Sequence, residues 1–443
     1  MINEKEFWYN KISYLRKMKA FFSSMEYKGI NLWPIMANEV YTYYKNQDRK
    51  LFERIINIIR CLFFKENLYF SGKKGRILAT YFMPRKDHRD LVKGALSKFN
   101  KDELFLLDFY YYKKSMRFSG YKFTLPNIFL LLRIWHKFNK NKGLKKLLRK
   151  YYYLFIAKTY LRQKQIDNFY DYYKIVQPKV YIAFCSSAFP EETILTLLCK
   201  KHNVPTFTLQ HGFLDNRTSE FTPFIVQSEN IVSDYSLLWG KSSFDVQKKF
   251  TSPDILLVVG NPKYSLSEIK RKNFNPKRCS VFLSVTAYPE SNIKLVRIIN
   301  DFAQNHPDIS FQITTHPFDK VNNYKNLVSA KNIKLLKADS VKELLEKSDF
   351  VFVHNTSVAY EALLYSIPIL RFKDKDYSPT WENFDTFENL DQLEKLFYKL
   401  KNKEFYENMM KIYKKQMNNF FYFDKNVDVP TKYYQEIMNV LDE

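Results

Sequence analysis

The feature that most limits the fold of this chain is an alternation of short apolar runs with longer helical segments. In residues 348–370, SDFVFVHNTSVAYEALLYSIPIL, an apolar run ends in a polar turn, a helical pattern follows, and a second apolar run begins at Pro368. Short apolar runs bounded by turns predict buried strands, and the periodic segments between them predict helices. The alternation extends over residues 180–262, where a strand is expected to begin at Phe224, and over residues 281–370. It predicts an α/β fold with parallel sheets that helices cover on both faces.

A polar, basic linker separates the two series of strands, so we expect two Rossmann-like domains. A chain of 443 residues is long enough for two domains of ordinary size. The expected first domain covers residues 1–262, with extra N-terminal helices and a basic helical insertion at about 110–175. The expected second domain covers residues 279–425, and residues 426–443 are expected to form a C-terminal helix.

Polar residues follow three of the predicted strands, at the edge of a parallel sheet where ligands bind. These groups are Gln210-His211-Gly212, Thr315-His316-Pro317 and Asn355-Thr356-Ser357. The third group is a helix N-cap sequence, and the backbone N–H groups that follow it can bind an anion. Glu361 lies one turn further along the same helix, where its carboxylate could reach a ribose hydroxyl. An ordinary capped helix would carry the same residues, so this group alone does not establish a site.

The positive charge of the chain is concentrated in its N-terminal third. Residues 1–150 hold 33 Lys and Arg against 12 Asp and Glu, whereas the rest of the chain is close to neutral. A basic surface attracts an anionic partner, such as a lipid surface, a nucleic acid or a charged acceptor. The densest part is residues 135–150, WHKFNKNKGLKKLLRK, which fits an interfacial helix at a membrane. A solvated basic helix would have the same composition.

Several classes of protein lack their sequence signatures here. The cysteines are scattered without a CxxC pair, which argues against structural zinc and a disulfide framework and favours a reducing compartment. No signal peptide or apolar run of membrane-spanning length is evident, so we expect a cytoplasmic protein. There is no GxGxxG, Walker A or HExxH motif and no recognised nucleic-acid-binding module, so no nucleic-acid partner is expected.

The order of the motifs resembles a known group of enzymes. QHG is followed by Gly260-Asn261-Pro262, then by HP, then by S/T-x-x-x-E-A-L-x-x-x-x-P beginning at Ser357. This order resembles that of GT-B-fold transferases of bacterial surface-polysaccharide synthesis. Bacterial sialyltransferases, capsular Kdo transferases and CDP-glycerol glycerophosphotransferases share such elements. The resemblance covers roughly residues 175–400 and implies a GT-B-like fold, in which an acceptor domain and a nucleotide-donor domain face a cleft.

The resemblance implies roles for the residues of the donor domain. When a sugar nucleotide reacts, negative charge builds on the phosphate of the leaving group. His316, followed by Pro317, would donate to that phosphate, as the corresponding histidine does in the CMP-sugar enzymes. Thr356 and Ser357 would hold its other oxygens, and Glu361 would bind the ribose. A structural histidine at a strand end is the alternative for His316.

The resemblance also implies a general base in the acceptor domain. His211 could remove a proton from an attacking hydroxyl, because histidine titrates in the useful range. The glycerophosphotransferases are thought to use this histidine, whereas the sialyl- and Kdo-transferases use an acid. Asp215, Glu191 and Glu192 are therefore rival bases. A structural role at the turn before Gly212 is the alternative for His211.

One further sequence could suggest a metal site. Asp374-Lys375-Asp376 has the form of a metal-binding DxD motif, but it lies in a charged loop after the nucleotide helix. GT-B enzymes generally need no metal, so we expect this pair to be solvated or near the sugar, and we expect no metal or other cofactor. His354 precedes the phosphate turn and is expected to support it from behind.

The function implied by the resemblance is that of an inverting, metal-independent glycosyltransferase. It would move a sugar from a nucleotide-sugar donor, with CMP-sugars favoured by the HP motif, to a lipid-linked or growing cell-surface polysaccharide at the inner membrane face. One alternative is a polyol-phosphate transferase using CDP-glycerol, although the WHG and TDYSS sequences typical of those enzymes are missing. A further alternative is a sugar-nucleotide 2-epimerase, which would need more carboxylates around the site.

Overall fold

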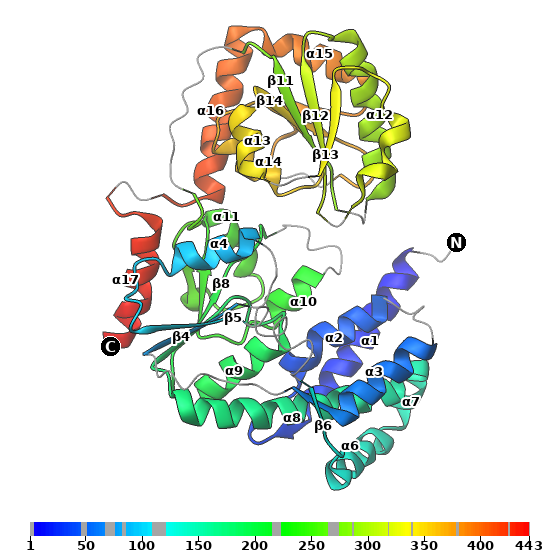
Figure 1. The fold of residues 1–443 in the computed structure, drawn as a ribbon, viewed down its shortest axis with the longest axis vertical. Coiled ribbons are helices and arrows are strands. Elements are labelled where there is room, and N and C mark those ends of the chain that lie inside the picture. The colour runs from blue at the N-terminus through cyan, green and yellow to red at the C-terminus, as the bar shows by residue number, and fades with distance from the viewer. Residues whose placement is uncertain are drawn as a thin grey trace.

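The computed structural model describes residues 4–45, 51–66, 76–81, 86–108, 121–214, 223–264, 274–285, 288–317, 319–337, 340–377, 381–423 and 426–442. These residues form two domains, each built on a six-stranded parallel sheet with helices packed against it (Figure 1). The two predicted Rossmann-like domains and the extra N-terminal helices are therefore confirmed.

The first sheet has the strand order β10–β9–β8–β7–β4–β5, and all neighbouring strands are parallel. Its strands are β4 (Ile77–Tyr81), β5 (Leu104–Asp108), β7 (Val180–Ala183), β8 (Thr206–Leu209), β9 (Tyr235–Leu238) and β10 (Leu256–Val258). The central strands β4, β7 and β8 are buried along their whole length, because the layers beside the sheet cover both faces. The helices between these strands include α4 (Lys86–Ala95), α9 (Pro190–Lys201), α10 (Pro223–Glu229) and α11 (Lys241–Gln247).

The strand predicted to begin at Phe224 is wrong, because this segment forms the helix α10. Pro223 is the first residue of that helix. Proline suits the first turn of a helix, since its fixed φ is helical and the missing N–H would have no partner there. The apolar run that suggested a strand is too short to distinguish the two structures by its period.

A helical layer lies beside the first sheet (Figure 1). It consists of α1 (Glu4–Ser23), α2 (Trp33–Lys45), α3 (Leu51–Phe63), α6 (Ile128–Lys140), α7 (Lys142–Leu148) and α8 (Tyr152–Val176). Two short antiparallel pairs connect these helices, β1 (Glu26–Tyr27) with β2 (Ile30–Asn31) and β3 (Phe64–Glu66) with β6 (Tyr121–Phe123). The long helix α8 packs against α3, α6 and α9 and so joins the layer to the sheet. No described helix is both long and apolar enough to cross a membrane.

The second sheet has the strand order β13–β12–β11–β14–β15–β16 and is also entirely parallel. Its strands are β11 (Arg278–Phe282), β12 (Ser310–Thr315), β13 (Ile333–Lys337), β14 (Phe350–Val353), β15 (Ile369–Phe372) and β16 (Thr386–Phe387). Its helices are α12 (Pro289–Asn305), α13 (Val341–Lys347), α14 (Val358–Leu363), α15 (Leu390–Leu400) and α16 (Lys403–Phe420). Short 3-10 helices lie at Arg149–Tyr151, Pro253–Ile255, Val321–Asn323, Lys325–Leu327 and Asn383–Asp385.

After α16 the chain returns to the first domain, where α17 (Val429–Asp442) packs beside α4 (Figure 1). Tyr433 and Ile437 are completely buried in the apolar core of the first domain. The Tyr433 hydroxyl donates to the Gly260 carbonyl oxygen at 3.1 Å. Gly260 has a φ of +96°, and a Cβ there would lie 2.6 Å from the Tyr422 carbonyl oxygen. The glycine of the Gly-Asn-Pro element is therefore required where the backbone of the returning chain passes close to it.

Candidate functional site

Strand ends from the two domains meet at an aromatic contact. Phe213, which follows the turn after β8, stacks on Tyr360 of α14 with ring centroids 4.0 Å apart. Other aromatic rings pack against the edges of Phe213, namely those of Trp239, Phe420 and Phe421. Because His211 lies two residues before Phe213 and Glu361 directly follows Tyr360, candidates from both domains reach the same junction.

The predicted phosphate turn lies between β14 and α14. Asn355 adopts a φ of +38°, a left-handed conformation that asparagine tolerates better than most residues. Its side-chain amide donates to the Asp376 carbonyl oxygen at 2.5 Å. The Thr356 hydroxyl accepts from the Val358 N–H at 3.4 Å, whereas the exposed Ser357 side chain makes no capping bond. The Ser357 hydroxyl is therefore available to a ligand at the start of α14.

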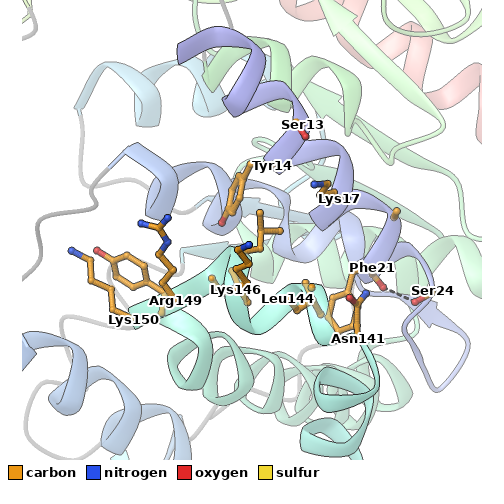
Figure 2. Close-up of a pocket in the computed structure, with 15 residues that line it drawn as sticks. Ser13, Tyr14, Lys17, Phe21, Ser24, Asn141, Leu144, Lys146, Arg149 and Lys150 are labelled. Carbon is orange, nitrogen blue, oxygen red and sulfur yellow. Dashed lines mark hydrogen bonds between the residues drawn. The ribbon is translucent and has the colours of Figure 1, made fainter. Parts of the chain in front are cut away.

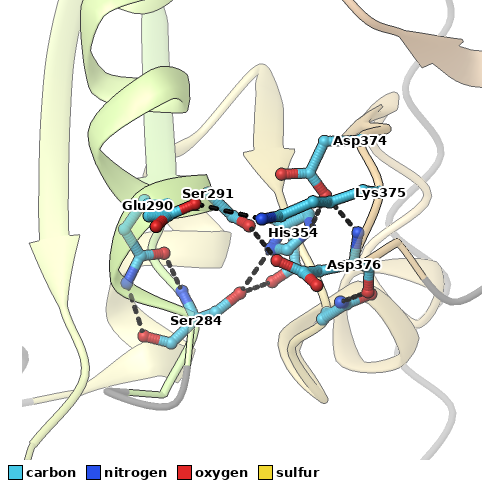
Figure 3. A network of polar contacts seen from close by, with 9 residues as sticks. Ser284, Glu290, Ser291, His354, Asp374, Lys375 and Asp376 are labelled. Atoms are coloured by element: carbon cyan, nitrogen blue, oxygen red, sulfur yellow. Dashed lines mark hydrogen bonds and ion pairs between the residues drawn. The ribbon is translucent and has the colours of Figure 1, made fainter. Parts of the chain in front are cut away.

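A buried histidine supports this turn from behind (Figure 3). His354 is fully buried, and its Nδ1 lies 2.9 Å from the Ser284 hydroxyl. Its Nε2 lies 3.1 Å from Asp374 Oδ1, which also accepts from the Asp376 N–H at 2.9 Å. Burial raises the pKa of Asp374, but hydrogen bonds from Ser291, the Asp376 N–H and His354 outweigh it and hold that pKa below its usual value. The Asp374 carboxylate therefore stays charged and fixes the His354 ring.

The residues of the DxD sequence are engaged in contacts of this kind. The Asp374 side chain is buried against His354, so this residue is not solvated. The other expectation, a position near the sugar, stays a prediction. Asp376 accepts from the Ser291 hydroxyl at 3.2 Å, and the exposed Lys375 forms an ion pair with Glu290 at 3.1 Å. Among the residues that the structure describes, no group of three or more His, Cys, Asp or Glu side chains could hold a metal ion.

His316 lies directly after β12, and its side chain is half-buried, while that of Pro317 is exposed. The strand β11 separates β12 from β14, and it pairs with both in parallel. Since neighbouring strands are about 4.8 Å apart, the His316 turn and the Asn355–Ser357 turn are about 10 Å apart along one edge of the sheet. Side chains from both turns could therefore reach a phosphate group bound between them.

Glu361, the candidate ribose ligand, is half-buried on α14 and accepts a short hydrogen bond from the Tyr264 hydroxyl. Tyr264 comes from the segment that follows the Gly-Asn-Pro element of the first domain. This bond joins the two domains beside the Phe213–Tyr360 stack. A ribose that binds Glu361 through the same carboxylate oxygen would have to displace the tyrosine.

The turn after β8 holds His211 at the same junction. The Gln210 side chain donates to the Gly212 carbonyl oxygen and accepts from the Trp239 N–H, both at 2.8 Å, and so fixes the turn. His211 as a whole residue is half-buried, and its ring centroid lies 5.0 Å from that of Phe184. Its position at the carboxyl end of a central strand is where a parallel sheet presents its ligand-binding groups.

Glu192 lies behind His211 and is completely buried. Its Oε1 accepts from the Thr80 hydroxyl at 2.6 Å and the Phe184 N–H at 3.1 Å, and its Oε2 accepts from the Cys185 N–H at 2.8 Å. A carboxylate held in this way cannot contact a substrate, but its charge acts on His211. The neighbouring Glu191 is also buried, and Asp215 lies outside the described residues.

The protonation of this cluster is coupled. Burial raises the pKa of Glu192 to about 7, although its hydrogen-bond donors and His211 oppose that shift. Burial lowers the pKa of His211, but the Cys185 and Glu192 side chains outweigh it and raise that pKa above its ordinary value. Burial raises the pKa of the Cys185 thiol, but the contact with His211 reverses this and lowers it. The protonation of His211 is therefore linked to that of Cys185 and Glu192.

Sequence reasoning missed two polar residues at this junction. Cys185 lies two residues after the end of the strand β7, at the sheet edge where the other candidates were sought. Its position in the sequence could therefore have indicated it. Tyr264 follows the Gly-Asn-Pro element by two residues, but its bond to Glu361 depends on how the two domains pack. No local pattern indicates that bond.

The raised pKa of Glu192 predicts a pH-dependent stability. The folded protein keeps the Glu192 proton after the unfolded chain has lost it, so stability falls as the pH rises from about 4.5 to about 7. This loss amounts to about 3 kcal/mol for such a shift. The raised pKa of His211 acts in the same direction, because its stabilising charge is lost as the pH rises through that pKa. We expect the wild-type Tm to fall relative to that of Glu192→Gln between about pH 5 and about pH 8.

Thermal unfolding at a series of pH values measures this difference. Glu229→Gln, which changes an exposed carboxylate, is the matched control and should follow the wild type. If the Tm values of the wild type and Glu192→Gln changed in parallel with pH, the raised pKa assigned to Glu192 would be contradicted.

Comparison with known proteins supports the fold assignment. No protein-family model and no curated protein sequence matches the chain. Among solved structures, a Listeria monocytogenes protein described as a UDP-N-acetylglucosamine 2-epimerase is similar, with a TM-score of 0.52 and 13% identity over 83% of this chain and 96% of that one. MnaA of S. aureus, in a structure with UDP, has a TM-score of 0.51 and 13% identity over 83% and 97%. WaaB, a lipopolysaccharide outer core galactosyltransferase, has a TM-score of 0.46 and 12% identity over 82% and 99%. The first two similarities, together with the two parallel sheets, confirm the predicted GT-B-like fold. They do not extend to the specific sialyl-, Kdo- or glycerophosphotransferase types.

Proposed function

We propose that this protein is an inverting, metal-independent glycosyltransferase that moves a sugar from a nucleotide sugar to a lipid-linked or growing cell-surface polysaccharide. The observation that carries the proposal is the Phe213–Tyr360 contact, which brings His211 of one domain to the same junction as α14 of the other. A transferase needs a base for the acceptor and donors for the leaving phosphate on opposite sides of the reacting carbon. The proposed location is the cytoplasmic side of the inner membrane.

The second domain would hold the nucleotide sugar. His316, Thr356 and Ser357 would donate hydrogen bonds to the phosphate, whose negative charge grows as the bond from C1 of the sugar to the phosphate oxygen breaks. Since α14 has only six residues, these side chains would contribute more than the helix dipole. Glu361 would bind the ribose once Tyr264 releases it, and Asn355 would keep the turn in position.

The first domain would activate the acceptor. His211 would take the proton of the attacking hydroxyl as its oxygen bonds to C1 from the face opposite the phosphate, which inverts the configuration at C1. Its partial exposure suits direct contact with a substrate. Glu192 acts as a positioning residue, because it is buried and reaches the reaction only through its charge on His211. Asp215 remains a predicted rival base.

Two alternatives use the same groups. A polyol-phosphate transferase would direct the activated hydroxyl to phosphorus, and the His-Gly pair at His211 favours this reading. A 2-epimerase would act on the donor without an acceptor, and the similar Listeria monocytogenes structure, described as such an enzyme, supports a shared fold. Of the carboxylates singled out by sequence near the junction, Glu192 is buried and Glu361 is bonded to Tyr264. An epimerase would therefore need acids beyond these two.

The donor class can be tested by nucleotide binding. We expect CMP or CDP to raise the Tm more than UDP or GDP, because a ligand that binds only the folded state stabilises it by mass action. We expect the shift to persist in EDTA. A preference for UDP or GDP would contradict the cytidine assignment, and no shift with any nucleotide would contradict the phosphate site itself.

His316→Ala tests the assigned phosphate donor. With the nucleotide sugar that the binding panel selects, we expect kcat/KM to fall by about 10²- to 10³-fold, as for the loss of one charge-stabilising donor. We expect Tm to change little, because the side chain is only half-buried. The control is His202→Ala, an exposed histidine at the end of α9. A His316→Ala protein that fails to fold while the control folds would indicate a structural histidine instead.

A further inference from the structure

The helix α6 exposes an apolar stripe to solvent. Ile128, Phe129, Leu132 and Trp135 recur at spacings that place them on one side of the helix, and all four are exposed, Phe129 by 86%. On the other side, Ile134 and Phe138 are buried in the core. The stripe is therefore not needed for packing within the domain. Contiguous exposed apolar surface of this kind marks an interaction site.

A basic pocket lies between α1 and α7 (Figure 2). Its volume is about 1220 Å³, and its lining includes Lys17, Lys146, Arg149 and Lys150 together with the apolar parts of Tyr14 and Leu147. No Asp or Glu is among the described residues that line it. Arg149 ends α7 with a φ of +44°, a strained conformation for arginine, and the chain there turns so that Arg149 and Lys150 both line the pocket.

The basic surface continues from this pocket to α6. A second hollow of about 590 Å³ shares Phe21, Ser24 and Asn141 with the first. Three more cations line it, namely Lys137, Lys140 and Lys142. Within the described part of the chain, none of the seven cations of the two hollows forms an ion pair with a carboxylate. Their charge is therefore available to an outside partner.

The apolar stripe and the basic hollows are joined, because Lys137 and Lys140 lie on the same helix as the stripe. The positions of these two lysines put them beside the stripe and not within it. An apolar stripe bordered by lysine and arginine is the pattern of a helix that lies in the surface of an anionic membrane.

Two other partners fit the pattern less well. A nucleic acid would engage the cations but offers no apolar surface for the aliphatic Ile128 and Leu132. A second copy of the chain packed face to face would bring the same unpaired cations together and repel itself. The charge and the apolar stripe together therefore favour lipid.

We propose that α6 docks this protein on an anionic lipid bilayer, with the stripe inserted among acyl chains and the pocket between α1 and α7 holding a lipid phosphate. This site lies outside the interdomain junction and does not depend on the proposed enzymatic function. The interfacial helix predicted for residues 135–150 is in fact two helices, of which α6 supplies the inserted face and α7 one wall of the pocket.

Vesicle flotation tests the charge requirement. The full chain should bind vesicles of phosphatidylcholine with phosphatidylglycerol, should bind phosphatidylcholine alone far more weakly, and should be released as salt is raised. Lys146→Glu with Arg149→Glu should weaken binding at least about tenfold. The control, Lys414→Glu with Lys415→Glu, makes the same charge change on exposed positions of α16 and should leave binding nearly unchanged.

A second double variant, with its own matched control, tests the apolar stripe. Phe129→Ser with Leu132→Ser should weaken vesicle binding at least about tenfold, because each removes an exposed apolar group that would enter the bilayer. The control, Ile175→Ser with Tyr398→Ser, replaces two apolar side chains that are exposed elsewhere. All replaced residues are exposed, so far-ultraviolet circular dichroism and Tm should match the wild type.

Fluorescence reports insertion directly. Trp135 is exposed, whereas Trp33, Trp239 and Trp381 are buried. Anionic vesicles should shift the emission to shorter wavelength, brominated lipid should quench it, and Trp135→Phe should abolish both changes. Equal binding to neutral and anionic vesicles would overturn the proposal, as would equal loss in the control variants. The proposal would also be overturned if the protein formed a dimer that the Phe129→Ser, Leu132→Ser variant dissociates. Binding to RNA but not to vesicles would overturn it as well.

Discussion

The proposed active site depends on the stacking of Phe213 on Tyr360. Each domain alone presents polar residues at the carboxyl ends of its strands, as parallel sheets generally do. The stack places the turn that carries His211 against the helix that carries Glu361. Tyr264 adds a hydrogen bond across the same junction, and α17 holds the returning chain against the first domain. In the proposed mechanism, these contacts would allow the base and the phosphate-binding residues to act on one substrate.

In both domains, a buried carboxylate lies beneath a histidine at a strand end. Asp374 fixes His354, which is itself fully buried and therefore supports the phosphate turn without reaching a ligand. Glu192 takes the corresponding position beneath His211, but His211 as a residue is only half-buried. The same pairing is thus structural in one domain and suited to proton transfer in the other. The difference lies in the exposure of the histidine.

The sequence predicts the two sheets well, because the alternation of apolar runs and helical segments is a local pattern. The positions of His211, His316 and the Asn355–Ser357 turn at strand ends could be predicted for the same reason. Their roles as site residues stay predictions. The burial of Glu192 could not be predicted, because its donors come from Thr80 and from the backbone of the preceding turn. The bond from Asp374 to His354 and the bond from Tyr264 to Glu361 likewise depend on tertiary packing. The DxD pattern was therefore expected to be solvated or near the sugar, whereas Asp374 in the structure supports His354.

The most direct test of the transferase assignment is to follow the donor and its products by proton nuclear magnetic resonance. The protein would be incubated with the nucleotide sugar it binds best, with and without a membrane-derived glycan acceptor. We expect the nucleotide to be released only when the acceptor is present, and the transferred sugar to show an inverted anomeric configuration. Conversion of the donor to its 2-epimer without any acceptor would contradict the assignment, as would transfer of a polyol phosphate from CDP-glycerol in place of a sugar.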